Sequence, residues 1–293
     1  MMDWLFFFEV SLAGLGFGAL YSLTAVAFVV IYKATRVINL AMGEMLMLGA
    51  YMFFGFAGAL ALPIWGALIL ALAGGAMVGL ILERLVIRPM LGESPISVFM
   101  VTIGLSSVFI GLVEIIWTAA PRSLPGFLPS DPIFIGDAFV APKTFWSFII
   151  AAVVIAVFLI LFRFWRGGVA LRATASDQGA AYAMGINVPM VYSLAWGVAG
   201  LLAAGAGVLL GSIAGISSEM GFFGLTVLVV VIVGGLDSVL GALLAGLLIG
   251  WVESLAGVYL GGEYEHLVTF MILMVVLLLR PWGLFGTREI ERL

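Results

Sequence analysis

The chain has 293 residues, of which 64% are hydrophobic and 10% are charged, and its formal net charge is −4. A soluble globular domain carries about 25% charged residues, so this composition excludes one. The sequence has no cysteine and a single histidine, which excludes a disulfide framework, thiolate metal sites and a zinc site of three histidines.

Long apolar runs predict an all-α polytopic membrane protein. Runs such as "FIIAAVVIAVFLILF" do not alternate between apolar and polar positions, which excludes a membrane β-barrel. One helical crossing needs about 20 apolar residues, and we expect eight to ten crossings. The predicted spans, in chain order, are 5–32, 39–61, 64–87, 95–119, 145–165, 189–212, 221–236, 239–259 and 266–282. The glycine-rich stretch 213–240 is either one crossing or a crossing with a broken or re-entrant piece.

The cations of the sequence predict an orientation. When alternate connections are assigned to one side, ten of the twelve Lys and Arg residues fall together. These are Lys33, Arg36, Arg84, Arg88, Arg163, Arg166, Arg172, Arg280, Arg288 and Arg292. The positive-inside rule places that side in the cytoplasm. We therefore expect a multi-pass protein of a bacterial inner membrane, with the N-terminus outside, the C-terminus inside and the proline-rich loop 120–143 outside.

The largest predicted cytoplasmic connection, residues 166–188, reads like a piece of a soluble protein. Thr174 is predicted to cap a short helix, with Asp177 as its capping-box partner. Gly185 suits the left-handed position that ends such a helix, and Asn187 is predicted to cap the next one. This segment is either the contact surface for a cytoplasmic partner or an ordinary interfacial loop.

Polar residues inside the predicted spans are candidates for a permeation path or a gate, because buried polar groups in a bilayer are costly. These are Asn39, Glu44, Thr102 and Glu253. Asn39 and Glu44 have a second interpretation, as a helix cap and an acidic first turn. Glu253 either pairs with serine or backbone groups of a neighbouring helix or lines the path.

Two further groups of polar residues are expected to have local roles. Thr102, Ser106 and Ser107 share one helical face and are expected to bond within their own helix. Asp237 and Ser238 are expected to cap the helix that follows them.

Several stretches resemble one family of transport proteins. "GAAYAMG" (179–185) is similar to a degenerate form of the "EAA---G" signature of permease subunits in bacterial ATP-binding-cassette importers, with Gly179 where a glutamate is usual. The stretches 18–51, 234–250 ("GGLDSVLGALLAGLLIG") and 280–286 ("RPWGLFG") resemble the H-type permease of branched-chain amino-acid importers. The likeness runs from about residue 8 to residue 287.

The resemblance implies an importer permease fold, with residues 1–293 as one transmembrane permease domain. It implies two ATPase subunits, a second permease of the M type, an external solute-binding protein and a branched-chain or other hydrophobic amino acid as the solute. It also implies that the ATPase contacts the chain at Arg172, Asp177, Ala180, Ala181 and Gly185. The "NLAMGEM" stretch around Asn39 and Glu44 resembles a family pattern that contributes to the path or gate.

The chain itself is not expected to be an enzyme. It contains no G-x-x-x-x-G-K-[ST] phosphate loop, so ATP and Mg²⁺ are expected in partner subunits, and no cofactor, metal, catalytic residue or nucleic acid is expected for this chain. Two alternatives remain open from the sequence: a secondary carrier driven by an ion gradient, and an assembly subunit without a path. The sequence also leaves open the particular solute and whether the permease pairs with itself or with a sibling.

Overall fold

The computed structural model describes residues 4–287 as a bundle of helices. Arg288 and Arg292, two of the predicted cytoplasmic cations, lie outside the described residues.

The first half comprises α1 (Trp4–Thr35), α2 (Met42–Phe54), a π turn (Gly55–Ala59), α3 (Ile64–Leu82), a second π turn (Glu83–Ile87), a 3-10 turn (Arg88–Met90) and α4 (Pro95–Trp117). A hairpin of β1 (Ile133–Ile135) and β2 (Ala138–Val140), paired Ile133 to Val140, precedes α5 (Pro142–Phe164). The second half comprises α6 (Arg166–Ser176), α7 (Gln178–Ala183), α8 (Val188–Ala214), the 3-10 turn η4 (Ser218–Phe222), α9 (Phe223–Gly234), α10 (Val239–Tyr259), a 3-10 turn (Gly262–Tyr264) and α11 (Glu265–Leu279).

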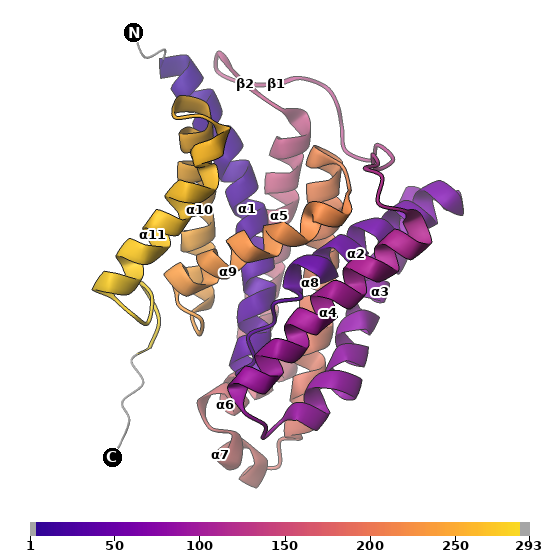
Figure 1. Ribbon diagram of the computed structural model, residues 1–293, viewed down its shortest axis with the longest axis vertical. Coiled ribbons are helices and arrows are strands. Elements are labelled where there is room, and N and C mark those ends of the chain that lie inside the picture. Colours follow the sequence, from indigo (N-terminus) through magenta and orange to yellow (C-terminus); the bar gives the residue numbers. More distant parts are fainter. Residues whose placement is uncertain (1–3, 288–293) are drawn as a thin grey trace.

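Eight helices in the described part of the chain are long and apolar enough to cross a membrane, and they match eight of the nine predicted spans. The ninth prediction, 221–236, corresponds to α9, which has only 12 residues. At 1.5 Å per residue α9 is about 18 Å long, shorter than the ~30 Å hydrocarbon core. Of the two alternatives left open for 213–240, the structure therefore favours the broken piece, which gives, within residues 4–287, eight crossings of the eight to ten expected. α9 lies obliquely across the middle of the bundle (Figure 1).

The centre of the molecule is formed by helices whose backbones touch. Of the most apolar window of α1, 89% is buried, against 11% for the span that contains α11, so α1 is central and α11 peripheral. Glycines allow the close approach, because a side chain at these positions would collide with the backbone of the next helix. The contacts join α1 to α10 (Gly18, Gly246, Gly250), α3 to α8 (Gly75, Gly79, Gly200) and α2 to α8 (Gly49, Gly207).

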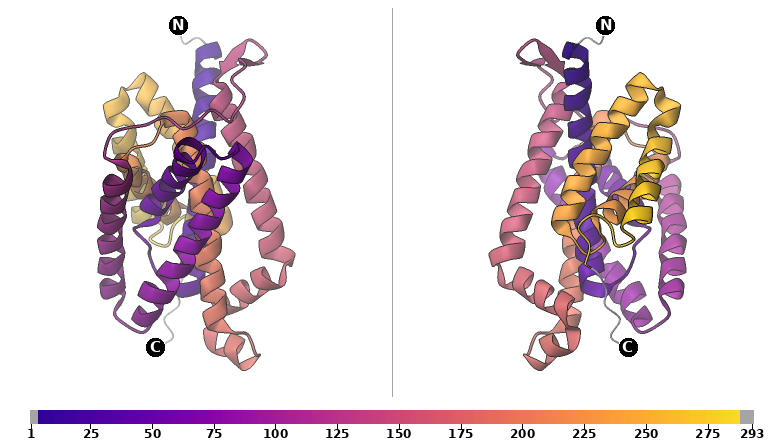
Figure 2. Two further views of the ribbon diagram at one scale, coloured as in Figure 1. Left: turned by 90° about the vertical axis from the view of Figure 1, so that its right-hand side faces the viewer. Right: turned by 90° about the vertical axis from the view of Figure 1, so that its left-hand side faces the viewer.

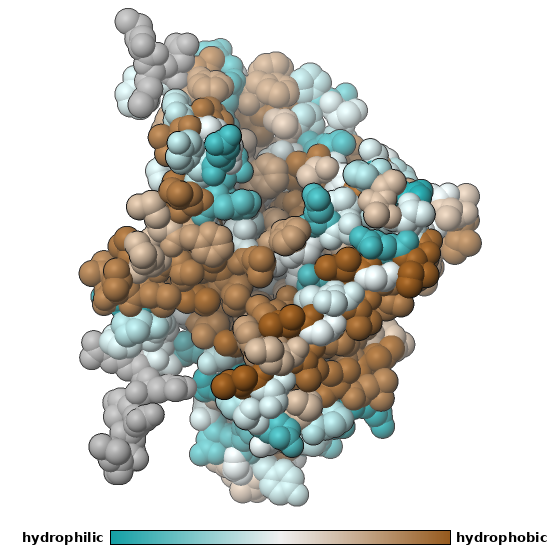
Figure 3. Space-filling model, in the orientation of Figure 1, coloured by the Kyte–Doolittle hydropathy of each residue, from teal (hydrophilic) through white to brown (hydrophobic). Residues whose placement is uncertain are grey.

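The two ends of the bundle differ in structure. The β1–β2 hairpin lies beside the start of α1, where the Phe139 amide donates to Glu9 Oε1 at 2.7 Å. Helices α6 and α7 lie at the opposite end, beyond the end of α5 (Figure 2). On the face seen in Figure 3, apolar residues form a belt between two more polar ends. This belt is what a membrane-spanning bundle exposes to lipid.

The segment 166–188 differs from the prediction in one respect. It contains two helices, and Thr174 is a buried residue inside α6 rather than a helix cap. α6 is amphipathic, since Gly168, Leu171 and Thr174 recur every third residue and face the bundle. The N-cap of α7 is Asp177, whose Oδ1 accepts from the Ala180 amide at 2.9 Å.

Candidate functional site

Four polar side chains lie where α2 begins and α4 passes beside it, and we call them the polar cluster: Asn39, Glu44, Thr102 and Ser106. Ser106 Oγ donates to Glu44 Oε2 at 3.2 Å. Thr102 Oγ1 accepts from the Leu40 amide at 3.3 Å and donates to the Phe99 carbonyl at 2.8 Å. Glu44 is 7% exposed, while Asn39 and Thr102 are fully buried. The cluster therefore joins α4 to the connection between α1 and α2.

Asn39 does not cap α2 as predicted. The N-cap position is Ala41, which makes no side-chain bond. Asn39 Oδ1 instead accepts from the Ala41 amide at 3.1 Å, which closes a turn just before the helix. Glu44 does lie in the first turn of α2, where its charge suits the positive end of the helix.

The 3-10 turn η4 lies against the polar cluster and against both α2 and α4. Gly221 contacts the carboxylate of Glu44 so closely that a Cβ there would lie 2.6 Å from Oε1. Two residues earlier in the same turn, Glu219 lines a cavity of about 480 Å³ together with Arg122, Ser217 and Ser218. This outer cavity is open at the hairpin end of the molecule, because its walls are residues 119–123 and 214–219.

A second cavity, of about 250 Å³, lies on the other side of the polar cluster. It is lined by residues 35–38 and by residues of the 90–99 segment, including Phe99, whose carbonyl accepts from Thr102. The polar cluster thus separates an outer cavity from an inner one along α4. Such an arrangement can act as a constriction between two openings.

Glu253 lies apart from the polar cluster and belongs to a contact among α1, α10 and α11. Tyr21 OH donates to Glu253 Oε2 at 2.6 Å, and Thr269 Oγ1 donates to Oε1 at 3.3 Å. His266 Nδ1 lies 3.3 Å from the same Oε1. Glu253 is 6% exposed. Of the two interpretations left open by the sequence, these contacts favour pairing between helices, although through hydroxyl and imidazole groups of tyrosine, threonine and histidine rather than serine or backbone.

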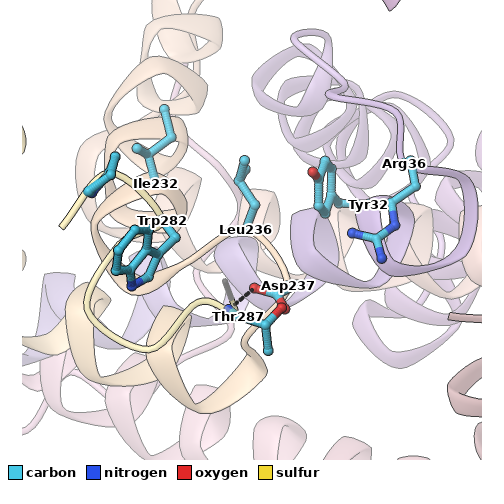
Figure 4. A pocket seen from close by; sticks show the side chains of 8 residues that line it. Tyr32, Arg36, Ile232, Leu236, Asp237, Trp282 and Thr287 are labelled. Atoms are coloured by element: carbon cyan, nitrogen blue, oxygen red, sulfur yellow. Dashed lines mark hydrogen bonds between the residues drawn. The ribbon is translucent and has the colours of Figure 1, made fainter. Parts of the chain in front are cut away.

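Asp237 and Ser238 divide the role that was predicted for both. Ser238 caps α10 by accepting from the Gly241 amide at 3.0 Å. Asp237 instead accepts from the amide and the hydroxyl of Thr287, which holds the C-terminal segment against the end of α9. A cavity of about 300 Å³ lies beside this contact, between Trp282 on one side and Tyr32 and Arg36 on the other (Figure 4).

The five predicted ATPase-contact residues lie in or beside α7. Asp177 fixes the start of α7, and Gly185, with φ +84°, takes the left-handed position after its end. Ala180 is exposed, but Ala181 is 4% exposed and packs toward the bundle. Arg172 lies on α6 and donates to the Arg163 carbonyl at 3.0 Å. Two exposed residues were absent from the prediction: Tyr182 on α7, 74% exposed, and Met184, the C-cap of α7, 83% exposed.

Sequence reasoning missed a buried ion pair at the end of α3. Arg88 binds both carboxylate oxygens of Glu83, at 2.9 Å each, and the Glu83 side chain is 1% exposed. Ser193 of α8 donates to Glu83 Oε2 at 2.8 Å. The available signal was two opposite charges at the end of an apolar span, but their spacing of five does not predict a pair on an α-helix.

The chemistry of these sites is binding rather than catalysis. The polar cluster offers one carboxylate, one amide and two hydroxyls, of which only the carboxylate carries a charge. Within residues 4–287, no three His, Asp or Glu side chains lie close enough to hold a metal ion.

Comparisons with known proteins give a consistent result. A family model described as the permease component of branched-chain amino acid transport systems matches residues 10–277. The high-affinity branched-chain amino acid transport permease LivH of Escherichia coli K12 is 32% identical, over 99% of both chains. BraD of Pseudomonas aeruginosa, a permease described in the same words, is 30% identical over 95% of both chains. A probable LivH of Methanocaldococcus jannaschii is 27% identical over 92% of this chain and 90% of that one.

One solved structure shares the fold. A chain of PsaBC from Streptococcus pneumoniae, solved in complex with Fab, superposes with a TM-score of 0.50 over 92% of this chain and 90% of that chain. The two sequences are 13% identical, so the likeness concerns the fold alone.

Proposed function

The chain belongs to the family of permease components of branched-chain amino acid transport systems, and we propose that it forms the path of an ATP-driven importer. It is a multi-pass membrane protein. Its proposed solute is a branched-chain or other hydrophobic amino acid, released to it by an external binding protein. The proposed assembly contains two ATPase subunits, which bind ATP and Mg²⁺, and a second permease.

The observation that carries this proposal is the exposed surface of α7 and of the residue that follows it. Tyr182 on α7 and its C-cap, Met184, are large and exposed, and they belong to the coupling segment 166–188, which lies at the end of the bundle opposite the hairpin (Figure 2). Exposed apolar residues in such a place indicate a protein partner. α7 is fixed at both ends, by Asp177 and by Gly185, so a partner that moves α7 moves it as a unit.

The polar cluster and its two cavities support the choice of solute. A solute arriving at the outer cavity meets one cation, Arg122, and one carboxylate, Glu219. The next charged group inward is the Glu44 carboxylate, beside Gly221. One group of each sign at the entrance and few fixed charges beyond it suit a zwitterion with an apolar side chain. We propose that the outer cavity faces the outside of a bacterial inner membrane and that α7 faces the cytoplasm.

Reconstitution of the chain with its co-purifying subunits into liposomes tests this proposal. The chain is purified in mild detergent from its native membrane, and the subunits that accompany it are identified and counted. Uptake of labelled leucine, delivered by the binding protein, should require ATP inside the liposomes and should persist when an ionophore removes all ion gradients. A partner ATPase with its phosphate-loop lysine replaced serves as the matched control and should abolish uptake.

The same experiment separates the alternative function, a carrier driven by an ion gradient. Uptake that ends with the ionophore and ignores ATP would overturn the importer proposal. Uptake that requires ATP but prefers another solute would keep the importer and replace only the hydrophobic amino acid. Competition by unlabelled amino acids, amides and urea ranks the solutes.

A further inference from the structure

The ion pair between Arg88 and the buried carboxylate of Glu83, at the end of α3, is part of a larger contact with the start of α8. Besides the two bonds to Glu83, Arg88 Nη2 donates to Ser193 Oγ at 2.8 Å and to the Pro189 carbonyl at 3.1 Å. Ser193 Oγ in turn lies 2.8 Å from Glu83 Oε2. We call Glu83, Arg88, Ser193 and the Pro189 carbonyl the α3–α8 junction. The junction fixes α3 to the first turns of α8 through polar contacts that require a defined geometry.

The local backbone is shaped to form this pair. On an α-helix, residues five apart point about 140° away from each other, so Glu83 and Arg88 could not meet. The chain takes a π turn at Glu83–Ile87, whose i to i+5 hydrogen bonding brings residues five apart onto one side. π turns are rare and occur frequently at functional sites.

Stability alone does not account for the junction. Burying a carboxylate is expensive, and a well-packed apolar pair in its place is often as stable or more stable. What a bidentate pair provides in addition is a fixed register between two elements. The structure therefore calls for a reason to fix α3 against the start of α8.

That reason is the position of α8 directly after α7. α8 begins at Val188, and the connection from α7 is held by backbone bonds from Gly185 to Tyr182 and from Ile186 to Ala181, at 3.0 Å each. Asn187 accepts from the Met190 amide at 3.1 Å and continues the constraint into α8. A displacement of α7 therefore displaces Pro189 and Ser193 as well, because the connection between the helices is held by these hydrogen bonds.

From the junction the displacement has a direct route to the polar cluster. α3 and α8 are in backbone contact along their lengths at Gly75, Gly79 and Gly200, so they move together. α3 continues through the π turn Glu83–Ile87, the 3-10 turn Arg88–Met90 and residues 91–94 into α4, which carries Thr102 and Ser106. The contacts of these two side chains with Leu40 and Glu44 are single hydrogen bonds of 3.2–3.3 Å, which break more easily than backbone packing.

We propose that Glu83 and Arg88 are positioning residues that make α3, and through it α4, follow α7, so that the polar cluster opens when α7 moves. This inference rests on the proposed function, because it assumes that an ATPase moves α7. It assigns the junction a role in coupling rather than in solute binding.

Two variants of the junction and one control test the inference in the reconstituted importer. Arg88→Gln removes the ion pair together with the guanidinium bonds to α8. Ser193→Ala removes only the side-chain link to α8, and it leaves in place the ion pair and the bond from Arg88 to the Pro189 carbonyl. Arg84→Gln is the matched control, since Arg84 lies in the same π turn with an exposed side chain and loses the same charge. ATP hydrolysis, uptake per ATP hydrolysed and the amount of folded complex are measured for each.

A distance measurement distinguishes coupling from mere stabilisation. The chain has no native cysteine, so spin labels at Ser107→Cys on α4 and Leu225→Cys on α9, both on exposed positions, report only the chosen pair. ATP should change the distance between the labels in the parent and in Arg84→Gln. In Arg88→Gln this change in distance should disappear, and uptake per ATP hydrolysed should fall about tenfold while ATP hydrolysis is retained. Ser193→Ala should give values of both quantities between those of the parent and those of Arg88→Gln.

The outcomes are separable. An unchanged ATP-driven distance change and unchanged uptake per ATP in Ser193→Ala and in folded Arg88→Gln would overturn the inference and leave the importer intact. If Arg88→Gln does not assemble, Ser193→Ala alone decides by the same criterion. Failure of ATP to drive uptake or a distance change in the parent chain would overturn the proposed function itself.

Discussion

Replacement of Glu44 by glutamine tests the polar cluster as the constriction through which the solute passes. In the parent chain, Ser106 Oγ donates to Glu44 Oε2 at 3.2 Å. Glutamine has the same shape as glutamate, and its amide oxygen can still accept this hydrogen bond. The substitution thus removes only the negative charge from a side chain that is 7% exposed. A hydrogen bond from an ammonium group to a charged partner contributes about 1.5–3 kcal/mol. Its loss should lower kcat/KM for uptake by roughly 10- to 150-fold, at about 1.4 kcal/mol per factor of ten.

The assay is the initial rate of ATP-dependent uptake into liposomes, measured against the concentration of the loaded binding protein. Ser106→Ala is the matched control, because it keeps the carboxylate and removes one neutral hydrogen bond. That bond contributes about 1 kcal/mol, so the control should lose no more than about fivefold. Size-exclusion profiles show whether each variant assembles.

One result would refute the reasoning. If Glu44→Gln assembles normally and keeps the uptake rate of the parent, no cationic group of the solute meets this carboxylate on its way through. The polar cluster would then be only a contact that holds α4 against α2. A loss in Ser106→Ala as large as that in Glu44→Gln would mean that removing the charge has no larger effect on uptake than removing one neutral hydrogen bond of the polar cluster.

Three further predictions concern other elements. Gly185→Val forces a β-branched residue into φ +84°, which costs about 1–2 kcal/mol or more, so uptake per ATP hydrolysed should fall while membrane insertion persists. The control Gly185→Asn should be tolerated, and equal uptake by the two variants would contradict a fixed end of α7. Glu253→Gln weakens the contacts with Tyr21 and Thr269, so it should lower the melting temperature of the purified complex and leave KM for uptake unchanged. An unchanged melting temperature with a changed KM would place Glu253 on the path. Gly200→Val drives a side chain into the backbone at Gly75 and should destabilise the fold by about 1–3 kcal/mol. Gly104→Val is the control, because nothing lies within 4 Å of a Cβ added there. An equal loss of folded protein in both variants would contradict the backbone contact between α3 and α8.

The membrane spans could be predicted from the sequence because a helix in lipid must satisfy its own backbone and expose apolar side chains over its whole length. That requirement leaves a continuous signal, and eight predicted spans correspond to helices of the structure. α6 left no such signal, because only one of its faces is buried, at Gly168, Leu171 and Thr174. Thr174 and Asp177 are both good capping residues, and the sequence does not decide between them without the packing of α6.

The candidate sites could be predicted only in part, because they are made of contacts between distant residues. Asn39, Glu44 and Thr102 were predicted one at a time. The structure places them in one region because Ser106 bonds to Glu44, 62 positions away, and Thr102 bonds to the Leu40 amide beside Asn39. The pairing of Glu83 with Arg88 could not be predicted, because it depends on a π turn for which the sequence contains no recognisable pattern. The exposure of Tyr182 and Met184 depends on how α7 projects from the bundle.

The short helix α9 bears on the choice between an importer and a carrier driven by an ion gradient. Broken helices in the membrane are common in such carriers, where the free carbonyls at the break coordinate the coupling ion. In this chain the carbonyls of Val233 and Gly234, at the C-terminal end of α9, accept from the Leu284 and Phe285 amides at 2.8 and 3.1 Å. The C-terminal segment therefore occupies the groups that an ion would use, while the other end of α9 meets the polar cluster at η4. Because protein groups take the place of a coupling ion at one end of α9 and the polar cluster lies at its other end, the contacts of α9 favour the proposed importer over a carrier driven by an ion gradient.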